Sequence, residues 1–172
     1  RGMVRTLDPH SDYLDPDERA VIEPASVVGH VFVKEAVTHL APARLREDIG
    51  QQLGALTDKQ LVLPDRSRSL AEEAFRFHHI MIRDTAYAAL PKAVRADLHE
   101  RFADWVAQRG ELVELDEIVG YHLEQAARYK HELGQSDPAL AERAGARLAA
   151  AGRRALWRWD RRAAAGMLER AL

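Results

Sequence analysis

Two short runs of strand-forming residues interrupt a chain that is otherwise patterned as helix. The first is Leu61–Leu63, ended by Pro64, and the second is Phe75–Phe77, in which Arg76 separates two phenylalanines. The segment between them, Asp65–Ser69, is polar and is expected to form a turn. Alternating apolar and polar residues favour a half-buried strand. The sequence therefore predicts one short two-stranded hairpin within a mainly α fold.

The first helix predicted ahead of this hairpin has clear signals at both ends. Asp15 can cap the N-terminus, Pro16 suits the first helical position, and Glu18 can complete a capping box. Gly29 is a natural stop after the last apolar residue. Pro24 lies inside this helix and is expected to kink or split it, because proline removes one backbone hydrogen bond.

Two further helices, at residues 33–40 and 43–59, are predicted between Gly29 and the hairpin from apolar residues at helical spacing. Three helices followed by a short hairpin is the element order of a winged-helix domain. We therefore expect a linker over residues 1–14 and a winged-helix-like domain over residues 15–80.

Everything after the hairpin is patterned as antiparallel helix pairs separated by proline or glycine. Residues 139–172 match one helix–turn–helix unit of about 34 residues, the period of tetratricopeptide repeats. A single repeat cannot bury its own apolar face, so neighbouring helices are expected. We predict a helical linker over residues 81–134 and the start of tetratricopeptide-like repeats over residues 135–172. The predicted helices are residues 79–89, 92–108, 115–133 and 138–159, with a last helix capped by Asp160.

The composition is that of a globular protein with almost balanced charge. Lys and Arg number 25 against 27 Asp and Glu, a formal net charge of −2, whereas a dedicated DNA-binding domain is usually basic. Cysteine is absent, which suits a reducing cytosol. No apolar run approaches the roughly 20 residues of a membrane span, and the N-terminus lacks a signal-peptide core. We expect a cytoplasmic piece of a longer protein, without a membrane partner.

The run Phe75–Pro91, from the second strand through the next helix, resembles a family signature. It is similar to the winged helix and helical linker of STAND-class (AAA/NB-ARC-like) signalling ATPases, as in bacterial adenylate/guanylate-cyclase-type proteins and large LuxR-type transcriptional regulators. Further similar segments are Leu98–Ala103, Ile118–Ala126 and Ala25–Phe32. The resemblance spans about residues 15–172.

The resemblance implies a machine of several domains. An upstream ATPase domain would bind ATP or ADP with Mg, the winged helix would pack against it in the resting state, and the repeats would sense a protein or small-molecule ligand. Output would come from another domain, such as a nucleotide cyclase or a DNA-binding domain. No phosphate-binding motif of the form G-x-x-x-x-G-K-[ST] occurs in this chain. Neither catalysis nor a cofactor is therefore expected in the chain itself.

His79 is the one candidate for nucleotide contact, because the resemblance implies that a histidine of the winged helix touches the β-phosphate of ADP. It follows the hairpin at the start of a helix, where backbone amides favour anions. The local sequence, His78–Ile80, differs from the Met-His-Asp form of eukaryotic relatives, and a hydrogen bond within the domain is the alternative role. Arg83 and Asp84 form a second candidate contact with the ATPase core, although an ion pair within the domain is favoured.

The histidines lack the spacing of a metal site. His78 and His79 are adjacent and would point about 100° apart on a helix. His99 and His122 fall on different predicted helices, without a metalloprotease-type spacing. No metal site is expected, and His122, on an apolar stripe, is predicted to be a hydrogen-bonded core histidine.

The run Arg153–Arg162 mixes basic and aromatic residues, as nucleic-acid surfaces can. The favoured interpretation is structural: Trp159 is predicted to belong to the packing stripe of its helix. Trp157 has no assigned role. Three arginines at a spacing of four are predicted to form a solvated row: Arg154, Arg158 and Arg162.

The favoured function is a non-catalytic regulatory and protein-interaction module of a multidomain signal-transduction ATPase. The alternative is a stand-alone DNA-binding winged-helix transcriptional regulator with a helical dimerisation tail. The helix that would read DNA carries Arg44 and Arg46 but also Glu47, Asp48 and Asp58, a balance that attracts phosphates weakly. A protein-binding winged helix is therefore favoured, and a homodimer formed through exposed repeat edges stays open.

Overall fold

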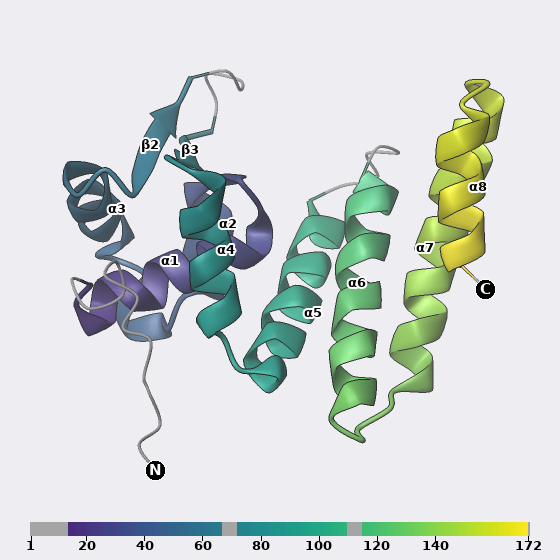
Figure 1. The fold of residues 1–172 in the computed structure, drawn as a ribbon, viewed down its shortest axis with the longest axis horizontal. Helices are drawn as coiled ribbons and strands as arrows, with labels where there is room; N and C mark the ends of the chain where they lie inside the picture. The colour runs from purple at the N-terminus through teal and green to yellow at the C-terminus, as the bar shows by residue number, and fades with distance from the viewer. Residues whose placement is uncertain (1–13, 67–71, 110–114, 172) are drawn as a thin grey trace, which may run out of the picture. The chain divides into compact units, whose positions relative to one another are not determined.

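The computed structural model describes residues 14–66, 72–109 and 115–171, which form eight α-helices and a small antiparallel sheet (Figure 1). The prediction of a mainly α fold is confirmed. The chain divides into two compact units, Arg1–Ala86 and Tyr87–Leu172, and the boundary between them falls within helix α4. In chain order the elements are α1 (Pro16–Val28), β1 (Val31–Val33), α2 (Lys34–Leu40), the 3-10 helix η1 (Ala43–Leu45), α3 (Ile49–Asp58), β2 (Val62–Asp65), β3 (Ala74–Phe77), α4 (Ile80–Ala89), α5 (Lys92–Gln108), α6 (Leu115–Glu132), α7 (Pro138–Trp157) and α8 (Arg161–Arg170).

The first unit contains a three-stranded sheet with β3 at its centre. Both β1 and β2 pair antiparallel with β3, which places Phe32 opposite Phe75 and Val62 opposite Phe77. The ring centroid of Phe32 lies 6.1 Å from that of Phe75 and 5.4 Å from that of Phe77. This aromatic cluster joins the core formed with the helices. Core residues contributed by α1, α2 and α3 are Val21, Ile22, Ala25, Val37, Ile49, Leu53 and Leu56.

Strand β1 is absent from the sequence prediction, which contains only the β2–β3 hairpin. Val31–Val33 continues directly into α2, and three residues are too few to show the period of a strand. Strand β2 also runs through Pro64, which was expected to end it. Because β2 lies at the edge of the sheet, the missing N–H of a proline is tolerated there. Residues 1–13 of the predicted linker (1–14) and residues 67–69 of the predicted turn (65–69) lie outside the described residues.

Helix α1 begins and ends as predicted. The Asp15 carboxylate accepts from the amide of Glu18 at 2.8 Å, and the Glu18 carboxylate accepts from the amide of Asp15 at 2.8 Å. Gly29 follows the last helical residue. The helix is not split at Pro24, which lies inside it and is buried.

The single helix predicted at residues 43–59 is wrong. A 3-10 turn, η1, comes first, and α3 begins only at Ile49. Leu45 and Ile49 are both buried and are four residues apart, so their spacing is that of a helix although a turn separates them. The amide of Asp48 closes this turn by donating to the Leu45 carbonyl at 3.0 Å. Periodicity alone could not distinguish this arrangement from a continuous helix.

The second unit consists of helices that pack in chain order, α5 on α6, α6 on α7 and α7 on α8 (Figure 1). Small residues permit close approach at two of these contacts. A Cβ added at Gly120 would lie 2.9 Å from Leu148, and one added at Gly152 would lie 2.8 Å from Leu168. Among the described residues, no helix is both long and apolar enough to cross a membrane.

The end of α7 corrects the prediction for Trp159. The helix ends at Trp157, and Trp159 has a positive φ of 62° and is 80% exposed, so it does not belong to the packing stripe. The predicted cap of the next helix is confirmed, because the Asp160 carboxylate accepts from the amide of Ala163 at 3.0 Å. The helical spacing of apolar residues continues in the sequence beyond Trp157, where the helix ends, and so predicted a buried position for Trp159 that the structure does not show.

The contact between α7 and α8 leads to a matched pair of variants. Gly152→Ala is expected to lower the free energy of unfolding by about 1–3 kcal/mol, because the new methyl group would overlap Leu168. A Cβ added at Gly166, on α8, would have no described atom within 4 Å. Gly166→Ala is therefore expected to raise the free energy of unfolding by about 0.5–1 kcal/mol. Urea denaturation followed by circular dichroism measures both values. A Gly152→Ala protein as stable as the parent would contradict the described packing.

Candidate functional site

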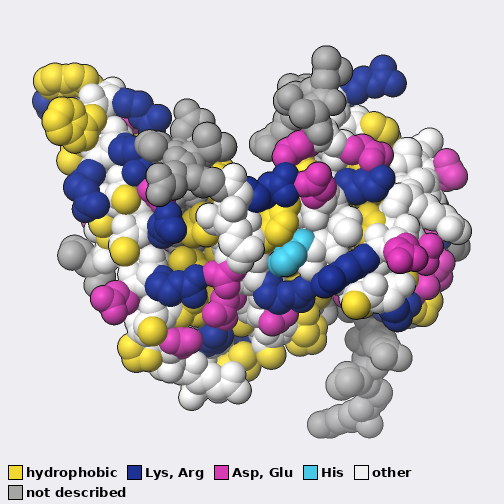
Figure 2. Space-filling view, turned by 180° about the vertical axis from the view of Figure 1, so that it is seen from behind, with side chains coloured by type: hydrophobic (Ala, Val, Ile, Leu, Met, Phe, Trp, Pro, Cys, Tyr) yellow, Lys and Arg dark blue, Asp and Glu magenta, His cyan; other side chains and the backbone are white. Residues whose placement is uncertain are grey.

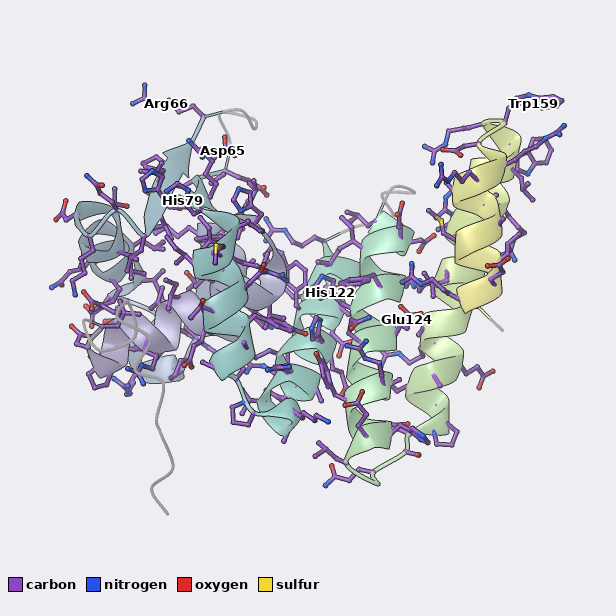
Figure 3. All side chains as sticks on the ribbon, in the orientation of Figure 1. Asp65, Arg66, His79, His122, Glu124 and Trp159 are labelled. Atoms are coloured by element: carbon purple, nitrogen blue, oxygen red, sulfur yellow. The ribbon has the colours of Figure 1, made fainter. Side chains whose placement is uncertain are left out.

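His79 lies on the surface, immediately before α4 (Figure 3). The preceding strand is anchored by Phe77, which is fully buried. The His79 ring stacks on that of His78 with centroids 4.3 Å apart and an angle of 19° between the planes. His78 in turn donates from Nδ1 to the Gln60 carbonyl at 2.9 Å. The neighbouring ring is therefore fixed, while the His79 imidazole is open to solvent.

Two large apolar side chains lie beside His79. Ile80 is 51% exposed and Met81 is 74% exposed. These two side chains are adjacent in the chain at the start of α4. His79, Ile80 and Met81 are together called the α4 entry surface below.

The other side of α4 packs within the first unit. Ile82 and Ala86 contact its hydrophobic core. Arg83 donates from Nε to the carbonyl of Ser26 in α1 at 2.9 Å and forms an ion pair with Asp84 at 3.0 Å. Arg83 therefore joins α4 to α1, which agrees with the role within the domain that the sequence analysis favoured.

The helical unit contains a buried chain of polar side chains. His99 on α5 and His122 on α6 are 1% and 4% exposed, and their Nδ1 atoms lie 2.8 Å apart. The Nε2 atom of His99 lies 2.9 Å from the hydroxyl of Tyr87, which lies 2.9 Å from the hydroxyl of Tyr129. Arg95 donates to the Tyr129 hydroxyl at 3.4 Å. This polar network connects the last turn of α4 to both α5 and α6.

The prediction of His122 as a hydrogen-bonded core histidine is confirmed, but its partner, His99, is not in the prediction. Each histidine lies on the buried face of its helix, and α5 and α6 are neighbours in the chain. The placement of both histidines on the buried faces of successive helices was the sequence feature from which their contact could have been predicted. Within the described residues no group of three or more His, Cys, Asp or Glu side chains is arranged to hold a metal ion.

The histidine pair restricts the protonation of the network. One Nδ1 must donate and the other must accept, so the two rings carry at most one positive charge while this bond exists. Burial raises the pKa of Tyr87, and the hydrogen bond with Tyr129 raises it further. Burial alone would raise the pKa of Tyr129, but its hydrogen bonds with Tyr87 and Arg95 lower the pKa below the usual value.

Asp116 on α6 binds two arginines of α7. It accepts from Arg147 at 2.6 Å and also from Arg154, and its side chain is 14% exposed. Burial alone would raise the pKa of Asp116, but the two arginine hydrogen bonds hold it below its usual range. Arg154 is therefore not part of a solvated row, whereas Arg158 and Arg162 are exposed as predicted.

A hollow of about 560 Å³ lies between α6, α7 and the end of α8. Its volume is within the range of about 300–1,000 Å³ of small-molecule sites. Its lining carries both signs of charge, from Glu124, Arg128, Glu142 and Arg170, and includes the small residues Ala144 and Gly145.

Chemically, the α4 entry surface offers an imidazole that can donate to an anion, beside apolar groups that a partner could cover. The polar network joins Tyr87 to α5 and α6 by hydrogen bonds. A scan against protein-family models found no match for the chain, and neither did searches of curated proteins and of solved structures.

Removal of the Tyr87 hydroxyl tests the network. Tyr87→Phe leaves the buried Nε2 of His99 without this partner, so the free energy of unfolding is expected to fall by about 1–2 kcal/mol. Tyr121→Phe is the matched control, since Tyr121 is 40% exposed and its hydroxyl is not part of the network; a change within about 0.5 kcal/mol is expected. Equal effects of the two variants in urea denaturation would show that the network contributes nothing.

The Asp116 ion pairs predict a pH dependence. Because the folded-state pKa of Asp116 lies below the usual 3.8, its stabilisation is fully present at neutral pH and is lost as the pH falls below that value. Asp116→Asn is expected to destabilise the protein by about 1–2 kcal/mol at pH 7 and by progressively less below pH 4. Glu117→Gln, an exposed neighbour, is the control. A pH-independent difference between Asp116→Asn and the parent would contradict this assignment.

Proposed function

We propose that this chain is a non-catalytic regulatory module of a STAND-class signalling ATPase, in which a winged-helix domain is joined to the first helices of a tetratricopeptide-like sensor. The observation that carries the proposal is the dual attachment of α4. Ile82 and Ala86 pack on the core of the first unit, and Tyr87, one residue later, belongs to the polar network of the helical unit. A displacement at the α4 entry surface is thereby coupled to the helices that would sense a ligand.

The order of elements in the first unit supports the winged-helix assignment. The order is helix, strand, two helices and a hairpin, and the first strand pairs with the far strand of the hairpin. In this assignment β2 and β3 form the wing, and α3 is the helix that would enter DNA in a DNA-binding relative.

The charges on α3 favour a protein partner over DNA. Within Ile49–Asp58 there is no Lys or Arg, and Asp58 is the one charged residue. Arg44 and Arg46, which the sequence prediction placed on this helix, precede it, and Arg44 forms an ion pair with Asp17. A helix with no positive charge has little attraction for phosphates. The stand-alone DNA-binding alternative is therefore disfavoured.

Close helix packing supports the assignment of tetratricopeptide-like repeats. Gly120 and Gly152 lie at the α6–α7 and α7–α8 contacts, where a side chain would overlap a leucine of the next helix. Ala144, Ala151 and Ala155 are buried on α7. Regular helix pairs with small residues at their contacts are what a stack of such repeats requires. The hollow between α6, α7 and α8 is the proposed place for a sensed ligand.

The proposed mechanism is a shift between docked and released states. In the resting state the α4 entry surface docks on an upstream ATPase domain that holds ADP, with His79 donating to a phosphate and Ile80 and Met81 covered. A ligand on the helical repeats changes this balance only through its different affinity for the two states. The chain supplies the contact and the connecting helix, and the chemistry of ATP belongs to the upstream domain.

ADP affinity of the full-length protein tests the proposal. His79→Ala is expected to weaken ADP binding about tenfold or more, the loss of one hydrogen bond to a charged group. Met81→Ala is expected to weaken it as well, because docking covers less apolar surface. His30→Ala, which removes another exposed histidine of the same unit, is the matched control and should leave ADP affinity unchanged. Isothermal titration calorimetry gives all four values.

Unchanged ADP affinity in both His79→Ala and Met81→Ala would remove the proposed docking contact. Binding of this chain to duplex DNA with a steep dependence on salt concentration would instead favour the transcriptional-regulator alternative.

A further inference from the structure

The turn between α7 and α8 exposes a pair of tryptophans. Seven consecutive residues, Leu156–Arg162, are exposed, with Trp157 at 85% and Trp159 at 80%. Figure 3 shows Trp159 at this turn, pointing away from both helices, and Figure 2 shows hydrophobic and basic side chains side by side at the same end of α7 and α8. Residues 156–162 are called the tryptophan tip below.

Trp159 also occupies a backbone position that usually belongs to glycine. The amide of Asp160 donates to the carbonyl of Ala155 at 3.0 Å, and the amide of Trp159 donates to the carbonyl of Leu156 at 3.0 Å. These two bonds form a Schellman motif, in which the residue with positive φ, here Trp159 at 62°, is most often glycine. A bulky residue there costs stability, and its exposed ring recovers little of that cost by packing.

The charge around the tryptophan tip is strongly positive. Arg153, Arg158, Arg161 and Arg162 are all exposed. The one acidic residue of the tip, Asp160, accepts a backbone hydrogen bond at the start of α8. Exposed arginines thus flank both tryptophans.

The geometry points to a peripheral binding site for an anionic lipid surface at the tryptophan tip. The indole rings of Trp157 and Trp159 would enter the headgroup layer, which tryptophan favours, and the flanking arginines would bind headgroup phosphates and carboxylates. This site is independent of the proposed regulatory function. A peripheral contact needs no spanning helix, so the finding on membrane-spanning helices does not bear on it.

The shape of the tip favours a lipid surface over a macromolecule with a defined surface. A specific protein interface usually takes about 20–30 residues from each partner, and single-stranded nucleic acid needs a basic groove that follows its backbone. The tip is one short turn between two helices. A bilayer accepts such a turn because it imposes no complementary shape.

Vesicle binding tests the proposal with the chain as it stands. The probes are vesicles of phosphatidylcholine alone and vesicles with 30% phosphatidylserine, each prepared with and without brominated acyl chains. Sedimentation is expected to recover the protein with the anionic vesicles only, and less of it as salt rises. Brominated anionic vesicles are expected to quench tryptophan fluorescence. In Trp157→Phe/Trp159→Phe, only Trp105 remains, and this quenching should disappear.

Two substitutions separate binding from folding. Trp159→Gly suits the positive φ, so thermal stability should be kept or raised while binding to anionic vesicles falls severalfold. Arg158→Gln is expected to weaken binding about fivefold, the effect of one positive charge near an anionic surface. Arg76→Gln, the same charge change on exposed Arg76 of β3, is the matched control and should bind as the parent does.

Equal binding to both vesicle types, or binding that Trp159→Gly and Arg158→Gln leave unchanged, would overturn the proposal. So would tighter binding to a single-stranded oligonucleotide than to anionic vesicles, which would assign the tip to nucleic acid. Tryptophan emission shielded from acrylamide in the full-length protein would show that another part of that protein covers the tip, and this too would overturn the proposal.

Discussion

Helix α4 contributes residues to both compact units, because the boundary between them falls after Ala86. Ile82 and Ala86 are four residues apart and share the face that packs on the first unit. Tyr87 follows at about 100° around the helix axis and belongs to the polar network of the helical unit. In the proposed function, coupling between the two units would run through this helix.

The polar network gives this coupling a discrete character. An apolar contact at Tyr87 would tolerate small shifts with little change in energy, but buried hydrogen bonds are either formed or lost, and a lost one leaves a desolvated polar atom. The bond between His99 and His122 adds a second condition, because it exists only with one nitrogen as donor and the other as acceptor. A switch between two states is better served by such contacts than by a core of uniform hydrophobic packing.

The sequence predicted the elements whose boundaries are set by local chemistry. Asp15 with Glu18, and Asp160, mark helix starts through hydrogen bonds to nearby backbone amides, which need no tertiary information. Pro91 marks the start of α5 through its fixed backbone conformation. The errors share another origin. β1 exists because a distant strand pairs with it, η1 separates residues with helical spacing, and the contact of His99 with His122 depends on how two helices pack. Each is decided by tertiary structure, which periodicity does not contain.

The places where local preference and structure disagree are also the places to which function is assigned. Trp159 has a positive φ that is usual for glycine, and the large apolar side chains of Ile80 and Met81 are exposed. His99 and His122 are buried and hydrogen-bonded to each other. The positive φ of Trp159 is the one of these that is expected to cost stability, because its side chain suits that backbone conformation poorly. Proteins commonly keep such features at functional sites, while their remaining elements follow local rules. The α4 entry surface and the tryptophan tip are on that reasoning the two surfaces of this chain that partners should recognise.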